Sequence, residues 1–170
     1  MENEILKEES LFVMPDKSEL QSRKNAGSWF EINVDFGKEI KKIMLRIRFY
    51  SRDEMLKNRQ KYLVKIKNPK THQFETVEDT ALREELSLKK QLELVTDWKG
   101  IGKNKSEPLE FSPENLKNFL DMFGTLETDI TNIEENENTG EKEEIKLTLH
   151  RCIFFLATDS SLHFGDKKNL

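Results

Sequence analysis

Residues 30–49 read FEINVDFGKEIKKIMLRIRF, and this stretch decides the expected fold. Apolar and polar side chains alternate on both sides of Gly37, which is the pattern of a strand with one buried face. The apolar rows are Phe30, Ile32, Val34 and Phe36, then Ile43, Leu45, Ile47 and Phe49. Because only a short polar turn separates the two rows, the sequence predicts an antiparallel hairpin.

Helical periodicity and caps dominate the remainder of the chain. Ser51 and Glu54 form a capping box for a helix that ends at Asn68 and Pro69. The further helices expected are 77–96, 112–124, a short helical turn over 125–133 and a last helix from about 141. The sequence therefore predicts an α+β fold, an N-terminal antiparallel β-hairpin followed by about four to five α-helices.

The chain of 170 residues fits one ordinary domain. Residues 1–27 mix charge, serine and proline around small apolar clusters, which is typical of an N-terminal arm. We assign residues 28–170 to a single α+β domain. Within it, residues 134–144 contain six acidic side chains and no apolar one, so an acidic, solvated loop is expected there.

The net charge and the cysteine content indicate which partners and which cellular compartment to expect. The net charge is −4, which disfavours nucleic acid as a partner. Cys152 is the single cysteine, so a reducing compartment is expected. No apolar run approaches the roughly 20 residues that span a bilayer, and the acidic residues 1–9 do not resemble a signal peptide. We expect a soluble cytoplasmic protein with no membrane contact.

The sequence contains no catalytic motif that is complete or more frequent than chance predicts. The glycines at 100 and 102 precede Lys103, but Asn104 follows where a phosphate loop needs Ser or Thr. Acid-x-Lys pairs occur as often as composition predicts, and Glu39–Lys41 beside Asp35 is the best-placed candidate for magnesium. None of the three histidines has zinc-ligand spacing. The sequence therefore predicts no catalytic residue, no metal and no cofactor.

The expected last helix carries apolar side chains on two faces. One stripe consists of Ile145, Leu149, Cys152, Ile153 and Leu156. Leu147 and Phe154 fall on the opposite side. Those two residues then need a second cover. Either they form a surface for a partner or a second copy, or the apolar cluster 11–13 of the arm lies over them.

One longer stretch is more specific. Residues 94–101 read LVTDWKGI, residues 107–116 read EPLEFSPENL, and Phe119 and Leu120 follow. This combination resembles small tail assembly chaperones of long-tailed bacteriophages and prophages. The sharp match covers about residues 92–123, and a looser one starts near 28. The family usually has Asp-Gly in the turn, where this chain has residues 103–106, and the segment 134–144 is additional.

The resemblance implies a non-enzymatic protein in the cytoplasm of a bacterial host. Such proteins bind helices of the tape measure protein and assist assembly of the tail tube protein. The candidate partner-binding residues are Trp98, Ile101, Phe111, Leu147 and Phe154. Trp98 is also expected to fold back on the preceding helix, with Phe111 stapling the next one. Alternatives are a tail-completion or connector protein, or a small metal-dependent nuclease or nucleic-acid binder. A homo-oligomer is left open.

Overall fold

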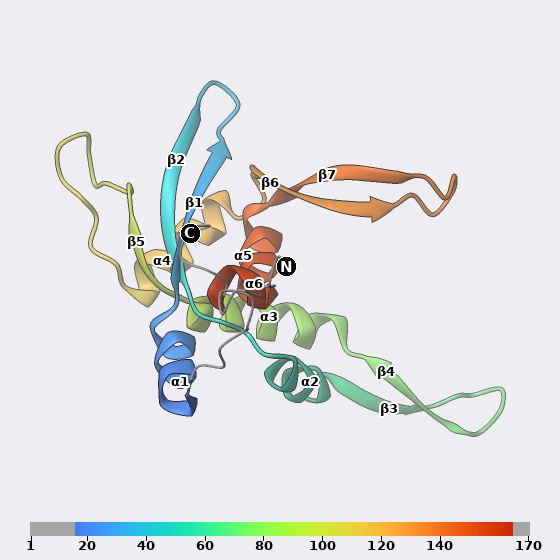
Figure 1. Ribbon diagram of the computed structural model, residues 1–170. Coiled ribbons are helices and arrows are strands. Elements are labelled where there is room, and N and C mark those ends of the chain that lie inside the picture. Colours follow the sequence, from blue (N-terminus) through green and yellow to red (C-terminus); the bar gives the residue numbers. More distant parts are fainter. Residues whose placement is uncertain (1–15, 165–170) are drawn as a thin grey trace, which may run out of the picture.

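The computed structural model describes residues 16–164, which form a mixed α/β fold around a five-stranded antiparallel sheet (Figure 1). The strand order is β5-β2-β1-β6-β7. The strands are β1 (Ser28–Asp35), β2 (Ile40–Ile47), β5 (Val95–Lys99), β6 (Glu127–Glu135) and β7 (Lys142–Thr148). A separate two-stranded sheet contains β3 (Leu63–Lys67) and β4 (Phe74–Glu78). The helices are α1 (Lys17–Ala26), α2 (Arg52–Gln60), α3 (Thr80–Leu94), α4 (Pro113–Phe123), α5 (Leu149–Thr158) and α6 (Ser160–Phe164).

The N-terminal hairpin is confirmed. β1 and β2 pair in antiparallel register, with Phe30 opposite Leu45 and Ile32 opposite Ile43. These side chains are buried, because they occupy the face of the sheet that the helices cover. Gly37 adopts φ +85° in the connecting turn, a conformation that glycine reaches without a steric penalty. The alternation of the sequence therefore placed both strands and their inward faces correctly.

The predicted fold class, one hairpin followed by helices, is wrong. The central sheet has five strands, and three segments expected to be helical are β3, β6 and β7. The helix capped by Ser51 does form, with the Ser51 hydroxyl accepting from the Glu54 amide at 3.3 Å, but it ends at Gln60. Val64 and Ile66 then alternate with lysines and pair with β4, as β-branched residues favour.

The segment expected to be an acidic loop is a β-hairpin. Glu135 of β6 lies opposite Lys142 of β7, and a tight turn closes the hairpin with the Asn136 amide donating to the Glu141 carbonyl at 2.8 Å. Exposed polar side chains do not prevent pairing, because the backbone hydrogen bonds of a two-stranded ribbon need no burial of its outer part. The last helix therefore begins at Leu149, after β7, and not near Glu141.

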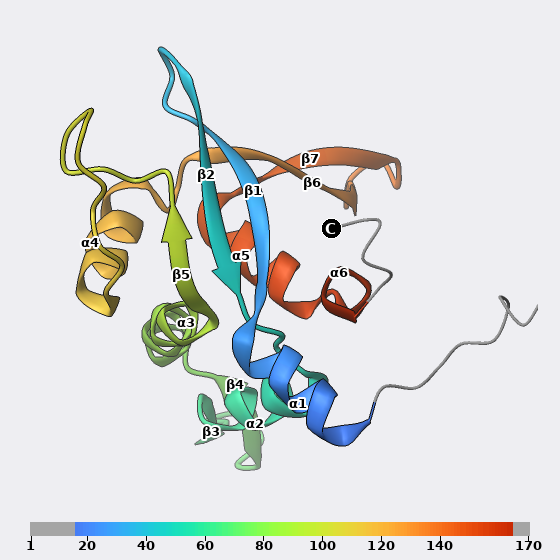
Figure 2. The same cartoon turned by 60° about the vertical axis from the view of Figure 1, so that its left-hand side comes forward.

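The core lies between the sheet and the helices α3, α4 and α5 (Figure 2). α5 contributes the buried residues Leu149, Cys152, Ile153, Leu156 and Ala157. The other face of the sheet is open, and there the Lys99 Nζ lies 4.2 Å from the centre of the Trp29 ring. Antiparallel sheets tolerate one solvated face. None of the helices within residues 16–164 combines the length and apolar character needed to cross a bilayer.

The N-terminal region contains a helix where the sequence suggested only an arm. α1 is tied to α2 by an ion pair between Lys24 Nζ and Glu54 Oε1 at 2.6 Å. Arg48 Nη1 reaches the other carboxylate oxygen of Glu54 at 3.0 Å. Burial alone would raise the pKa of Glu54, but the hydrogen bonds from Lys24 and Arg48 outweigh it and lower the pKa. The apolar cluster 11–13 lies outside the described residues.

Trp98 joins three elements. It lies in β5 opposite Leu45, and not in a helix-terminal loop folded back on the helix as predicted. The buried indole Nε1–H donates to the Leu109 carbonyl at 2.8 Å, and the ring meets Phe111 and Phe119 edge-on at 5.4 and 5.9 Å between centroids. α4 follows within the expected range 112–124, and Ser112 caps its start, since Ser112 Oγ accepts from the Asn115 amide at 3.0 Å.

Replacement of Trp98 by alanine should destabilise the fold by about 3–5 kcal/mol, because it opens a cavity and removes the Leu109 hydrogen bond. Urea unfolding in a Trp29→Phe background measures the loss. In that background the native fluorescence reports Trp98 alone and should shift to the red on unfolding. A native spectrum like that of free tryptophan, with a loss under about 1 kcal/mol, would contradict this placement.

Candidate functional site

An apolar socket opens between α2, α3 and α5. Its volume is about 270 Å³. The walls are formed by Tyr50, Met55, Leu56, Asn58, Arg59, Tyr62, Arg83, Ser87 and Phe154. The rings of Tyr50 and Phe154 lie 6.2 Å apart, and Leu56 at its mouth is 49% exposed. Exposed apolar side chains around an open cavity mark a place where another apolar group can bind.

Cationic groups surround the aromatic wall of the socket. Arg59 Nε and Arg83 Nη1 share Glu78, at 3.3 and 3.2 Å from its two carboxylate oxygens. The Lys90 Nζ lies 5.5 Å from the centre of the Tyr50 ring. Burial, and then the neighbouring Glu54 carboxylate, raise the pKa of Tyr50, so its phenol stays uncharged at neutral pH. The socket is therefore apolar inside, with two arginines at its rim that one carboxylate holds together.

The five predicted partner-binding residues do not converge on one site. Phe154 is half-buried and lines the socket. Leu147 is 1% exposed and lies in β7, so the helix with two apolar faces does not exist and Leu147 fills the core. Trp98 is buried, and Ile101 and Phe111 pack partly buried against the same core. Phe154 is thus the one of the five that lines the socket.

Sequence reasoning missed most of the socket. Met55 and Tyr62 lie in the segment expected to form one helix up to Asn68, but α2 ends at Gln60 and contains no buried residue. Their apolar face is turned to the socket instead. The sequence signal for this part of the socket is the amphipathic pattern of α2, which is too short to indicate a helix buried in the core. Tyr50 and Phe154 come from distant parts of the chain, so no local pattern could have brought them together.

A larger cleft of about 700 Å³ lies beside His150, between α3, the end of α4 and the start of α5. The His150 Nδ1 lies 2.6 Å from Oε1 of the buried Gln91. Nε2 faces Gly124 so closely that a Cβ there would overlap the ring. Burial lowers the pKa of His150, although Asp121 opposes the shift, so the ring is neutral at pH 7. Nδ1 is thus held by Gln91, and the ring fills the space beside Gly124.

The other candidates for chemistry are also held in structural roles. Burial raises the pKa of the Cys152 thiol to about 12, which keeps it protonated and unreactive. Glu39 pairs with Lys41 at 3.2 Å, and Asp35 accepts from the Gly37 amide at 2.8 Å. Both acids of the magnesium alternative are thus engaged within the hairpin turn. Nowhere in residues 16–164 do three potential metal ligands of the His, Cys, Asp or Glu type converge.

The glycine-containing loop after β5 is closed by its own side chain. Asn104 Oδ1 accepts from the amides of Ser106 and Glu107, at 2.9 Å each. Those amides would have to be free to hold a phosphate. The loop therefore has the form of a self-capped turn.

Comparison of the chain with protein-family models, with curated proteins and with solved structures finds no match.

Gly124 is required by the space that His150 occupies and not by its backbone angle, since its φ is −61°. Gly124→Ala should therefore cost about 1–3 kcal/mol of unfolding free energy, as overpacking does. In a His150→Ala background the same change should be neutral or stabilising, because alanine favours the helix end. A double-mutant cycle by urea unfolding measures the difference. Equal losses in both backgrounds would show that the ring and Gly124 are not coupled.

Proposed function

We propose that this protein is a non-enzymatic assembly factor that holds an apolar helical segment of another protein, as a tail assembly chaperone does. The observation that carries the proposal is the socket with Phe154 on its wall. Its volume of about 270 Å³ lies below the roughly 300–1,000 Å³ of most small-molecule sites. A space of this size suits one large apolar side chain from a partner.

The chemistry of the socket favours an amphipathic helix as its occupant. Such helices present apolar anchors at intervals of three to four residues, with charged residues beside them. Arg59 and Arg83 at the rim would meet acidic residues that flank the anchor. Leu56 at the mouth, 49% exposed, offers further apolar contact. This arrangement suits a chaperone, because the protein can cover an apolar surface of its client without enclosing the client.

The resemblance of residues 92–123 supplies the identity of the proposed client. It favours the helices of a tape measure protein, with the tail tube protein as a second partner, in the cytoplasm of a bacterial host. Trp98, Ile101 and Phe111, which carry the resemblance, build the core beside α4. In this proposal they position the fold, and Phe154 makes the client contact.

A tail-completion or connector protein is the second candidate. Its support is the projection of three hairpins, β1–β2, β3–β4 and β6–β7, in different directions from the body (Figures 1 and 2). Each hairpin contains a large exposed apolar residue. These are Ile40, Phe74 and Ile133, which are 69%, 72% and 68% exposed. A connector would use such arms to reach several neighbours at once.

Co-expression with the product of an adjacent gene that encodes a long helical chain tests the chaperone proposal. The wild type should keep that chain in the soluble fraction. Leu56→Glu should lose most of this effect, because a charge at the mouth of the socket opposes the entry of an apolar anchor. Met122→Glu is the matched control, because Met122 is an exposed apolar residue of α4 that does not line the socket. It should act like the wild type.

Two results would contradict the proposal. One is a loss of client solubility that is the same for Leu56→Glu and Met122→Glu, which would exclude the socket as the binding site. The other is cleavage of plasmid DNA or hydrolysis of ATP by the purified wild type in the presence of Mg²⁺. Circular dichroism melting of each variant separates a loss of binding from a loss of folding.

A further inference from the structure

The acidity of this protein is concentrated in one hairpin. The β6–β7 arm, residues 127–148, has eight acidic and two basic residues and thus a net charge of −6. Because the whole chain has −4, the remainder has a net charge of +2. The β3–β4 arm, residues 63–78, has three lysines and two glutamates and a net charge of +1. The two arms therefore differ in the sign of their charge.

Most charges on the two arms form no ion pair among residues 16–164, the exceptions being Glu134, which pairs with Arg151, and Glu78. In the described part of the structure, Lys65, Lys67 and Lys70 of the basic arm form no ion pair. The same holds for Glu141 and Glu143 of the acidic arm. In contrast, both acids of β4 have partners, since Glu78 binds Arg59 and Glu75 accepts from the Asn68 side chain. The lysines of the β3–β4 arm are thus exposed to solvent.

Each arm combines its charges with a large exposed apolar residue in the same arrangement. Phe74, 72% exposed, lies opposite Lys67 in the register of β3 and β4. Ile133, 68% exposed, lies opposite Glu144 in the register of β6 and β7. Beside Ile133 a groove of about 610 Å³ opens between the hairpin and Phe155 of α5. One arm therefore offers an aromatic ring beside lysines. The other, with its net charge of −6, offers a groove that Ile133 and Phe155 line together with Glu144 and Lys142.

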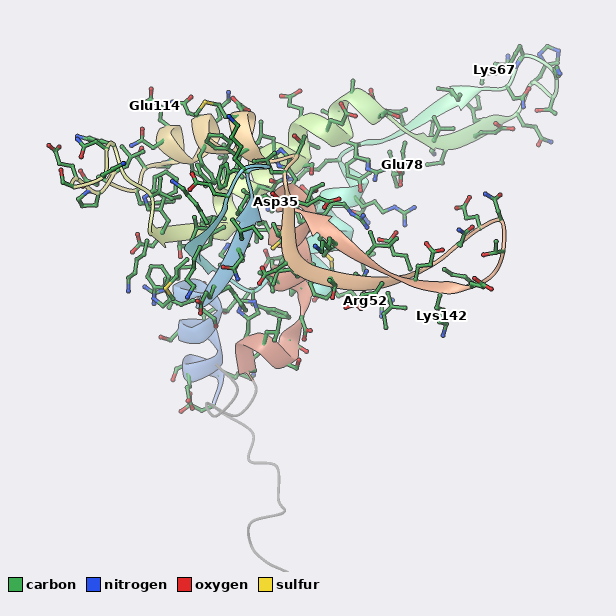
Figure 3. All side chains as sticks on the ribbon, turned by 90° about the horizontal axis from the view of Figure 1, so that it is seen from above. Asp35, Arg52, Lys67, Glu78, Glu114 and Lys142 are labelled. Carbon is green, nitrogen blue, oxygen red and sulfur yellow. The ribbon has the colours of Figure 1, made fainter. Side chains whose placement is uncertain are left out.

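Both arms project from the body, in diverging directions. Figure 1 shows β6–β7 and β3–β4 diverging on its right-hand side, and Figure 3 shows Lys67 and Lys142 on separate arms with open space between them. A two-fold axis between two copies can then place the basic arm of each copy on the acidic arm of the other. Such an isologous contact closes on itself and forms both complementary contacts at once.

We propose that two copies of this chain form a salt-sensitive dimer in which the β3–β4 arm of each lies against the β6–β7 arm of the other. Phe74 enters the groove beside Ile133 and Phe155, and the lysines of one copy face the glutamates of its partner. Opposite charges at such a contact set its orientation and accelerate association. β7 is an edge strand, so its free backbone groups are also open to pairing. This dimer is independent of the client-binding socket.

Sedimentation velocity of the full chain tests the proposal. The wild type should dimerise at about 50 mM NaCl and dissociate progressively towards about 500 mM, where screening is strong. The variants are Lys65→Glu/Lys67→Glu, which changes the net charge of the basic arm from +1 to −3, and Glu135→Lys/Glu137→Lys/Glu141→Lys/Glu143→Lys, which changes that of the acidic arm from −6 to +2. Each should raise the dimer Kd at least about tenfold, because like charges then meet. Mixing the two variants should restore association, since both contacts of the heterodimer again join opposite charges. Phe74→Ser should weaken the dimer without lowering the melting temperature.

The control is Lys103→Glu/Lys105→Glu, which makes the same charge change at exposed positions in the loop after β5. It should dimerise like the wild type. The proposal is overturned if the wild type stays monomeric at low salt, if the control loses the dimer as the arm variants do, or if the mixture does not associate. It is also overturned if the basic arm binds a single-stranded oligonucleotide while the protein remains monomeric.

Discussion

The burial of α5 against the inner face of the sheet is the interaction on which the other elements depend. Half of the ten residues of α5 are buried, and its two ends are tied to the surrounding backbone. At the start, the amides of Leu149 and His150 donate to the carbonyls of Leu126 and Gly124, and near the end the Ala157 carbonyl accepts from the Tyr50 amide. This one short helix thus joins β6, α4 and the segment after β2. The core that results is small, as expected for a chain in which 35% of the residues are charged.

A small core leaves much of the chain at the periphery, and the candidate binding features are found there. The socket lies where α2, which has no buried residue, meets α3 and α5. The arms extend past the body, where their apolar residues have no cover within the described chain. The two proposals use different parts of this periphery, because the client needs an apolar cavity and the second copy needs opposite charges. The same thin core explains why both surfaces remain available.

Local patterns predicted the parts of the fold that local physics determines. The hairpin at 30–49 and the helix α4 follow from strict alternation and from caps at Ser112 and Gly124. The sequence did not reveal β6, because Ile130 and Ile133 are spaced three apart as in a helix, and its strand conformation comes from pairing with β7. The run 134–144 looked like a loop because a projecting ribbon needs no apolar face. The socket was not predictable, since its walls come together only in the folded chain.

The central claim is that one cooperative core carries arms that can bind partners independently of it. Native-state hydrogen exchange tests this most directly. Amides of α5 and of the paired parts of β1 and β2 should exchange only through global unfolding, with the free energy that urea unfolding gives. Amides of β3–β4 and of the outer half of β6–β7 should exchange at free energies lower by several kcal/mol. Equal protection in the arms and in α5 would contradict the account, because the arms would then belong to the core.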